Sequence, residues 1–365
     1  MKPAAAEESE LLRDLGPSLT NAFGDVGAPA VEGLRGDAST RIYYRLTLRA
    51  PTAPTTALVM RLPADALRSD EGTGADIPPE LPFLNMQRAL AVRGVPVPRV
   101  LAHDVPRRVV LLEDLGDETF EARLRERGVA AWPELYGHAV DLLADMHDRM
   151  ASAEPGCIAY TRRFDEALLR WELEHFVEWG IDALRFPLTD AARATLASNF
   201  DALARELAEA PPHFVHRDYQ SRNLMWTGDR LTVIDFQDAL LGPMPYDLVA
   251  LLCDSYVALA PELQRSLIAR YVERRGGHVD RAAFERLFWK VAVQRKLKDT
   301  GRFVFIDRVR GNPSFLPSFA PSLRYVARAL AELPELRAVD GILREVLPGY
   351  PDAVRTPDPM SRAGE

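Results

Sequence analysis

Four polar residues that could carry out phosphoryl transfer lie at fixed spacing in one stretch of the chain. His216, Asp218 and Asn223 fall in the segment HRDYQSRN, and Asp235 follows twelve residues after Asn223. Phosphoryl transfer needs a carboxylate beside the acceptor hydroxyl and oxygen ligands for the Mg²⁺ that bridges the ATP phosphates. A loop that carries Asp218 and Asn223 can direct one group to the acceptor and the other to the metal. The spacing therefore predicts chemistry that uses ATP and Mg²⁺.

These residues need particular elements around them. Apolar runs on either side of the Gly228-Asp229 turn predict a hairpin that returns Asp235 toward the loop. Alternating apolar residues predict another hairpin over 41–62, and helical spacing predicts a helix over 83–92. From residue 118 onward the pattern is mainly helical. Strands followed by helices predict a two-lobed α+β fold. We expect a tail or loosely held helix over 1–25, a β-rich N-lobe over 26–112, a hinge over 113–118, and a mostly helical C-lobe over 119–365.

Composition excludes several classes of protein. Among 365 residues, 47% are hydrophobic and 27% charged, which is typical of a globular chain of about two domains. The net charge of −8 argues against a nucleic acid or an anionic membrane as partner. The two cysteines lack metal-ligand spacing and favour a reducing compartment. With neither a signal-peptide pattern nor a long apolar stretch, we expect a cytoplasmic protein, and we expect it to be a monomer.

The segments HRDYQSRN and IDFQ resemble the catalytic and metal-binding loops of the protein-kinase-like superfamily, in its aminoglycoside phosphotransferase and choline kinase branch. The resemblance implies that Asp218 is the catalytic base and that Asn223 and Asp235 are Mg²⁺ ligands. It also implies that His216 orients the loop and that Asp247 braces it. Gln237 stands where protein kinases have the Gly of D-F-G, which points away from protein substrates.

A narrower resemblance rests on motifs spread along the chain. They include GDAS at 36–39, PRVL at 98–101, DFQDA at 235–239 and QRKLK at 294–298. This set is similar to bacterial kinases that phosphorylate the anomeric hydroxyl of N-acetylmuramate and N-acetylglucosamine in cell-wall recycling. Two alternatives stay open at this point. One is a kinase of the same fold for an aminoglycoside, a choline-like alcohol or another sugar, and the other is a nucleotide-binding pseudokinase.

Nucleotide contacts are expected in the N-lobe. A loop before the first strand pair is placed to cover the phosphates, and backbone groups after the buried strand at 108–112 are placed to meet adenine. The strand Lys that this superfamily uses for phosphates is missing, and Arg61 is the best substitute, since guanidinium also binds phosphate. The expected nucleotide-binding residues are Gly36, Asp37, Ser39, Thr40, Arg61, Glu113 and Leu115.

The acceptor, a small molecule of the amino-sugar class, is expected to meet the helical half of the chain. Cationic side chains there suit the lactyl carboxylate or sugar oxygens. An acidic residue and an aromatic ring add a polar contact and a platform. The expected acceptor-binding residues are Arg222, Glu172, Trp179, Arg295 and Lys298.

Overall fold

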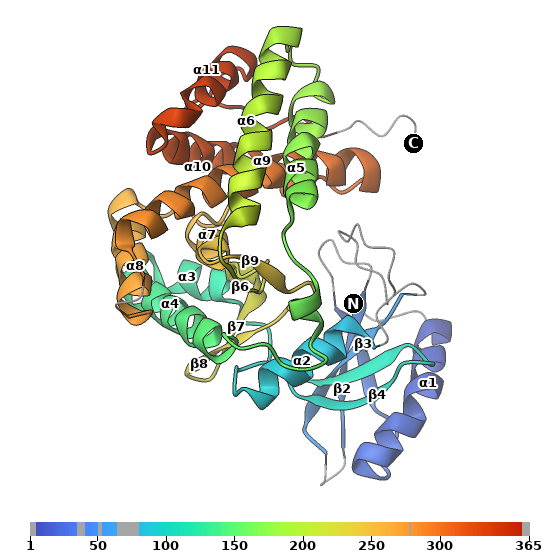
Figure 1. Ribbon diagram of the computed structural model, residues 1–365. Coiled ribbons are helices and arrows are strands. Elements are labelled where there is room, and N and C mark those ends of the chain that lie inside the picture. The colour runs from blue at the N-terminus through green and yellow to red at the C-terminus, as the bar shows by residue number, and fades with distance from the viewer. Residues whose placement is uncertain (1–4, 35–40, 50–52, 64–79, 277–278, 360–365) are drawn as a thin grey trace, which may run out of the picture. The chain divides into compact units, whose positions relative to one another are not determined.

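The chain forms two compact units. The structure, a computed structural model, describes residues 5–34, 41–49, 53–63, 80–276 and 279–359, and Figure 1 labels its elements. The first unit contains Met1–Glu118, Pro155–Ile158 and Met225–Asp238, and the rest of the chain makes the second.

A five-stranded antiparallel sheet is the base of the first unit. Its strands are β1 (Ala30–Leu34), β2 (Ile42–Thr47), β3 (Thr56–Arg61), β4 (Val100–Asp104) and β5 (Val109–Glu113). Their order across the sheet is β1-β2-β3-β5-β4. β2 and β3 form the hairpin expected over 41–62, with Tyr44 opposite Val59. Side chains alternate between the two faces of such a sheet, so each strand can bury one face.

Helix α1 (Ala5–Phe23) packs on one face of this sheet. Leu11 and Leu15, one helical turn apart, are buried in a cluster with Tyr44 and Val59. This segment was expected to be a tail or a loosely held helix. It is instead a packed helix, because its leucines recur on one face and cover the sheet (Figure 1).

A later segment of the chain completes the first unit. The backbone N–H of Val233 donates to the carbonyl oxygen of Pro96 at 2.8 Å, and Phe236 stacks on Phe83 with ring centroids 5.1 Å apart. Asp235, which was expected in the C-lobe, therefore lies in the first unit. The elements that meet here are helix α2 (Pro82–Val92) and the strands β7 (Leu224–Thr227) and β8 (Arg230–Val233).

The second unit is mostly helical. Strand β6 (Pro212–Val215) pairs antiparallel with β9 (Leu240–Pro243) and introduces the candidate catalytic loop. The helices are α3 (Phe120–Arg127), α4 (Trp132–Arg149), α5 (Glu166–His175), α6 (Asp190–Glu209), α7 (Tyr246–Leu252), α8 (Pro261–Arg274), α9 (Arg281–Arg310), α10 (Phe319–Ala331) and α11 (Arg337–Val346). Short helical turns are η1 (Val129–Ala131), η2 (Ile158–Thr161), η4 (Ser221–Asn223), η5 (Pro313–Ser318) and η6 (Pro334–Leu336), and the π-helical segment η3 (Phe176–Asp182) extends α5. A β-rich unit and a mostly helical unit confirm the predicted α+β class.

Helix α9 is the central element of the second unit, with α5, α6 and α10 around it (Figure 1). It spans 30 residues and is buried along most of its length, including charged residues. The side chain of Asp280 caps its first turn, and Gly311 ends it in the left-handed conformation that glycine adopts without strain. Gly301 lets α9 approach the end of α5, because a Cβ there would lie 2.7 Å from the carbonyl oxygen of His175.

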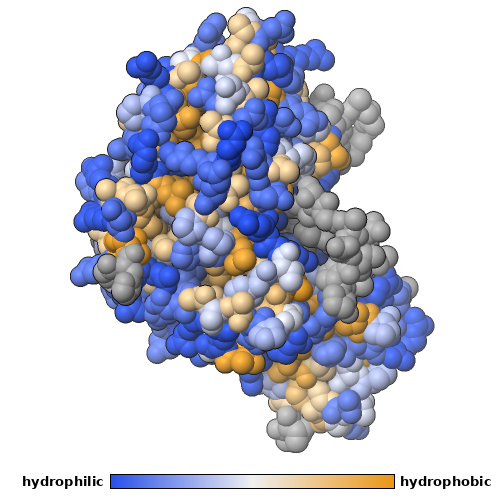
Figure 2. Space-filling view, viewed as in Figure 1, coloured by the Kyte–Doolittle hydropathy of each residue, from blue (hydrophilic) through white to orange (hydrophobic). Residues whose placement is uncertain are grey.

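The described surface is ordinary for an acidic globular chain. Hydrophilic residues cover most of the face shown in Figure 2, with hydrophobic ones scattered among them. Among the described residues, no helix combines the length and the apolar character needed to cross a bilayer.

Candidate active site

A buried carboxylate holds the candidate catalytic loop after β6. Asp247, in the first turn of α7, accepts hydrogen bonds from the backbone N–H groups of His216 at 2.7 Å and Arg217 at 2.9 Å. His147 lies 3.1 Å from the same carboxylate. The His216 ring turns inward, and its Nδ1 accepts from the backbone N–H of Asp218 at 3.2 Å. Asp247 and His216 thus have the geometry of loop supports, the roles that the resemblance implies for them.

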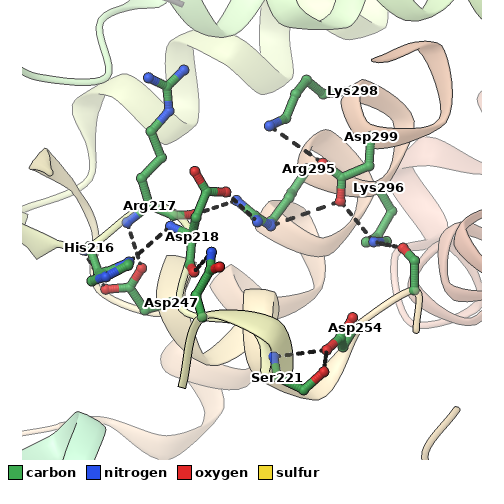
Figure 3. Close-up of polar contacts among 12 residues, drawn as sticks. His216, Arg217, Asp218, Ser221, Asp247, Asp254, Arg295, Lys296, Lys298 and Asp299 are labelled. Atoms are coloured by element: carbon green, nitrogen blue, oxygen red, sulfur yellow. Dashed lines mark hydrogen bonds and ion pairs between the residues drawn. The ribbon is translucent and has the colours of Figure 1, made fainter. Parts of the chain in front are cut away.

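Arg295 of α9 contacts the candidate base directly. Its Nη2 donates to Oδ1 of Asp218 at 3.1 Å, and its Nη1 donates to the carbonyl oxygen of Arg217 at 2.6 Å. The Arg295 side chain is only 3% exposed, whereas that of Asp218 is 31% exposed. Figure 3 shows Arg295 reaching the loop from α9. Arg295 was expected to bind the acceptor, and the structure corrects this, because its guanidinium is committed to Asp218 and the loop backbone.

Glu172 also contacts the candidate catalytic loop, through Arg217. Its carboxylate is fully buried and accepts from Nη2 of Arg217 at 3.1 Å and from Nε2 of Gln294 at 2.7 Å. Arg217 has a φ of +80°, a strained conformation for a residue other than glycine, so this fixed ion pair helps to hold it. The expected contact between Glu172 and a sugar is corrected as well, since both carboxylate oxygens are engaged inside the unit.

Asn223 is oriented by the loop itself. Its amide nitrogen donates to the carbonyl oxygen of Asp218 at 2.9 Å, and this leaves the amide oxygen on the other side, the atom type that Mg²⁺ prefers. The neighbouring Ser221 donates its backbone N–H to Asp254 at 3.0 Å, and its hydroxyl donates to the same carboxylate. Burial raises the pKa of Asp254. The only sequence signal of this second brace is that Asp254 is the one acidic residue in the apolar run 248–260, and no role was predicted for it.

Three cations surround Asp299 on α9, close to Asp218. Nζ of Lys296 lies 2.8 Å and Nζ of Lys298 lies 3.4 Å from its carboxylate, and Nε of Arg295 lies 4.0 Å away. Burial alone would raise the pKa of Asp299, but Lys296, Arg295 and Lys298 together hold it well below its usual range. Figure 3 shows both lysines directed at Asp299. The group carries more positive than negative charge, which suits an anionic acceptor.

The other expected acceptor residues have defined neighbours. Arg222 donates Nε to Glu121 at 2.8 Å and lies 3.7 Å above the ring of Tyr256. Trp179, in η3, makes an edge contact with Phe305 at a centroid distance of 5.1 Å. The roles of Arg222, Trp179 and Lys298 in acceptor binding stay predictions.

In the first unit, Asp235 has a strained backbone conformation. Its φ is +64°, and its side chain is 45% exposed. Gln237 donates its amide to Oδ1 of Asp235 at 2.9 Å. Within the described residues, no three His, Cys, Asp or Glu side chains gather as a metal site.

The residues expected to bind the nucleotide fall into two groups, those outside the described residues and those with defined neighbours. Gly36, Asp37, Ser39 and Thr40 lie outside the described residues. Glu113 pairs with Arg99 at 3.2 Å, and Leu115 is half-buried in the segment expected to be the hinge; their adenine role stays a prediction.

Arg61 does not fit the expected phosphate role. It shares a face of β3 with Ala57 and Val59, the face that α1 covers. Its guanidinium donates to Asp14 at 2.6 Å and to Glu10 at 2.9 Å, both in α1. The prediction is corrected, because an arginine bound to two carboxylates on the α1 face serves packing of that helix.

Arg295→Leu is expected to lower kcat by roughly tenfold to a hundredfold, because Asp218 loses the contact that orients it. The KM for ATP should change little, since Arg295 contacts the loop that carries the base. Arg295→Lys should recover part of kcat. Steady-state kinetics test this, with Lys290→Ala as the control on the same helix, where Lys290 pairs with Glu206. Equal losses in Arg295→Lys and Arg295→Leu, with a lowered melting temperature, would instead indicate a purely structural role.

The model of the phosphotransferase enzyme family matches residues 30–287. An N-acetylmuramate/N-acetylglucosamine kinase from Neisseria meningitidis serogroup B is 37% identical over 72% of this chain and 81% of its own length. One of the same name from Pseudomonas putida is 29% identical over 93% of this chain and 94% of its own. An ADP-bound aminoglycoside phosphotransferase has a similar fold, with a TM-score of 0.54 at 15% identity over 89% of this chain and 99% of its own.

Proposed function

The chain belongs to the phosphotransferase enzyme family, and from this premise we propose that it transfers the γ-phosphoryl group of ATP to the anomeric hydroxyl of N-acetylmuramate or N-acetylglucosamine. The observation that carries the acceptor class is the name shared by two relatives that align with 72% and 93% of this chain. The anomeric position rests on the motif resemblance. The product is the sugar 1-phosphate, an intermediate for amino-sugar recycling.

Asp218 accepts the proton in this proposal. Arg295 holds Oδ1 of Asp218, so Oδ2 takes the proton of the acceptor hydroxyl while the hydroxyl oxygen attacks the γ-phosphorus. The bond from the γ-phosphorus to the bridging oxygen breaks, and ADP leaves. The ring oxygen of a sugar makes its anomeric hydroxyl more acidic than an ordinary alcohol, which eases this transfer. Asp247 and Arg295 keep the carboxylate in place.

Asn223 and Asp235 are the proposed Mg²⁺ ligands. Both offer oxygen atoms, an amide and a partly exposed carboxylate, and these suit a hard cation. The assignment rests on the motif resemblance and on this donor chemistry. When bound, Mg²⁺ neutralises the charge that develops on the phosphates.

The acceptor is expected to be selected partly by charge. Lys296 and Lys298 lie beside the carboxylate of Asp299, near Asp218, so an anionic lactyl group is attracted and a cationic aminoglycoside is repelled. The side chain of Lys298 is only 9% exposed, and even the modest value of an exposed ion pair, about 1 kcal/mol, would bias affinity about fivefold.

The purified protein should convert N-acetylmuramate or N-acetylglucosamine to an acid-labile 1-phosphate with ATP and Mg²⁺. Lys298→Ala should raise KM for N-acetylmuramate about fivefold more than KM for N-acetylglucosamine, which lacks the carboxylate. Lys290→Ala is the control on the same helix. Product is measured by phosphorus NMR and by acid hydrolysis. Phosphate at the 6-position, or only on aminoglycosides or amino alcohols, would reject this acceptor and leave the kinase fold standing.

We further propose that the enzyme works in the cytoplasm as a monomer. Cys157 and Cys253 are both buried and neither forms a disulfide, which accords with a reducing compartment. ATP is available in that compartment.

A further inference from the structure

Strand β2 presents a row of polar side chains on the face that α1 does not cover. Side chains alternate along a strand, and Tyr44 and Leu46 are buried in the α1 cluster. Arg41, which directly precedes β2, and Arg45 within it therefore belong to the opposite face, as does Tyr43 between them. In agreement, the hydroxyl of Tyr43 contacts the sulfur of Met60, the strand neighbour opposite Tyr43.

The two arginines of this face have different partners. Arg45 donates to Asp114 at 2.7 Å and to Asp117 at 2.8 Å, and both carboxylates lie in the segment expected to be the hinge. These ion pairs hold the pKa of Arg45 above its usual range. Arg45 is thus a fixed link between β2 and that segment. Arg41 lies at the other end of the row.

Arg41 faces the candidate metal ligand. Its Nη1 lies 3.9 Å from Oδ1 of Asp235, and the two side chains are 21% and 45% exposed. This distance is an ionic contact rather than a hydrogen bond. Tyr43 is close enough to both residues to feel their charges. Burial raises the pKa of Tyr43 to about 12, the positive charge of Arg41 opposes that rise, and the negative charge of Asp235 adds to it. All three residues belong to the first unit.

We propose that Arg41 binds the nucleotide polyphosphate and supplies the positive charge that Arg61 was expected to supply. This inference rests on the proposed function. A metal ligand and a phosphate-binding cation must reach the same phosphates, and Arg41 is an arginine that the structure places beside Asp235. Its planar guanidinium suits two-point contacts with phosphate oxygens. Its contact with Asp235, at 3.9 Å, is longer than a hydrogen bond, so phosphate oxygens would offer Arg41 closer charged partners.

The test compares ADP with adenosine, which has no phosphate, by titration calorimetry without and with Mg²⁺. Arg41→Gln should weaken ADP binding about tenfold or more, as expected for loss of a hydrogen-bonded charge, and should leave adenosine binding unchanged. Arg41→Lys should fall between it and the wild type. The matched control is Arg61→Gln on the other face of the sheet, which should keep ADP affinity within about twofold and lower the melting temperature.

The inference is overturned if folded Arg41→Gln binds ADP like the wild type, or if ADP and adenosine weaken equally. If Arg41→Gln does not fold, Arg41→Lys carries the same comparison, since it keeps the charge and loses the two-point geometry. A wild-type protein that binds neither ADP nor ATP would contradict the proposed function itself. Normal ADP binding by the wild type together with equal ADP binding by Arg41→Gln would contradict only the role of Arg41.

Discussion

Asp218→Asn is expected to lower turnover at least ~10²-fold while ADP affinity stays near that of the wild type. The side chain of the base contacts the acceptor in the proposed reaction, and it has no proposed contact with the nucleotide. Asparagine keeps an oxygen that can accept from Arg295, so the loop retains its contact at 3.1 Å. What is lost is the carboxylate that takes the proton. Steady-state kinetics and ADP calorimetry on the same preparation measure the two effects.

The melting temperature shows whether the loop of the Asp218→Asn variant still folds. Since Asp247 and Arg295 hold the backbone of residues 216–217, the melting temperature of Asp218→Asn should match that of the wild type within a few degrees. A variant that stays folded and keeps more than a tenth of wild-type turnover would remove Asp218 from its role.

Local patterns in the sequence predicted most of the elements that position these residues. Alternation over 41–62 and the Gly228-Asp229 turn gave two hairpins that the structure contains, and helical spacing over 83–92 gave α2. Each signal depends on residues close together in the chain. The β-rich start and helical remainder, and hence the α+β class, follow from them.

Residues whose role depends on distant partners were harder to predict. Alternation shows that Arg61 shares a face with Ala57 and Val59, but only the packing of α1 shows which face is covered. Glu172 and Arg295 have charged side chains, which are usually exposed. Both are buried because partners far along the chain, Arg217 and Asp218, neutralise them. Sequence spacing does not report such pairings.

The position of Asp235 also depended on long-range contacts. The hairpin that precedes Asp235 begins at Leu224, directly after the candidate catalytic loop, and chain order therefore favoured the C-lobe. The bond from Val233 to Pro96 and the stacking of Phe236 on Phe83 instead place it with the sheet. The carboxylate charge of Asp235 can be removed by one substitution that leaves the candidate catalytic loop unchanged.

Asp235→Asn should abolish most of the gain in ADP affinity that Mg²⁺ gives. The substitution removes a carboxylate, the anionic ligand of the proposed pair, and leaves the neutral amide of Asn223. Without metal the expected effect has the opposite sign. The carboxylate repels phosphate and attracts Arg41 at 3.9 Å, so its loss should leave metal-free ADP binding equal or tighter. Turnover with Mg²⁺ should fall at least ~10²-fold, because the phosphates lose the neutralising charge of the metal.

Calorimetry with ADP, in EDTA and across a series of Mg²⁺ concentrations, measures the metal-free and the Mg²⁺-dependent change in ADP affinity in one variant. Asp229→Asn is the matched control, since Asp229 is an exposed carboxylate in the turn of the same hairpin, and it should follow the wild type throughout. A structural defect would weaken ADP binding in EDTA as well as in Mg²⁺, whereas loss of a metal ligand weakens only the second. Identical Mg²⁺ dependence in Asp235→Asn and the wild type would mean that the metal is held by other residues.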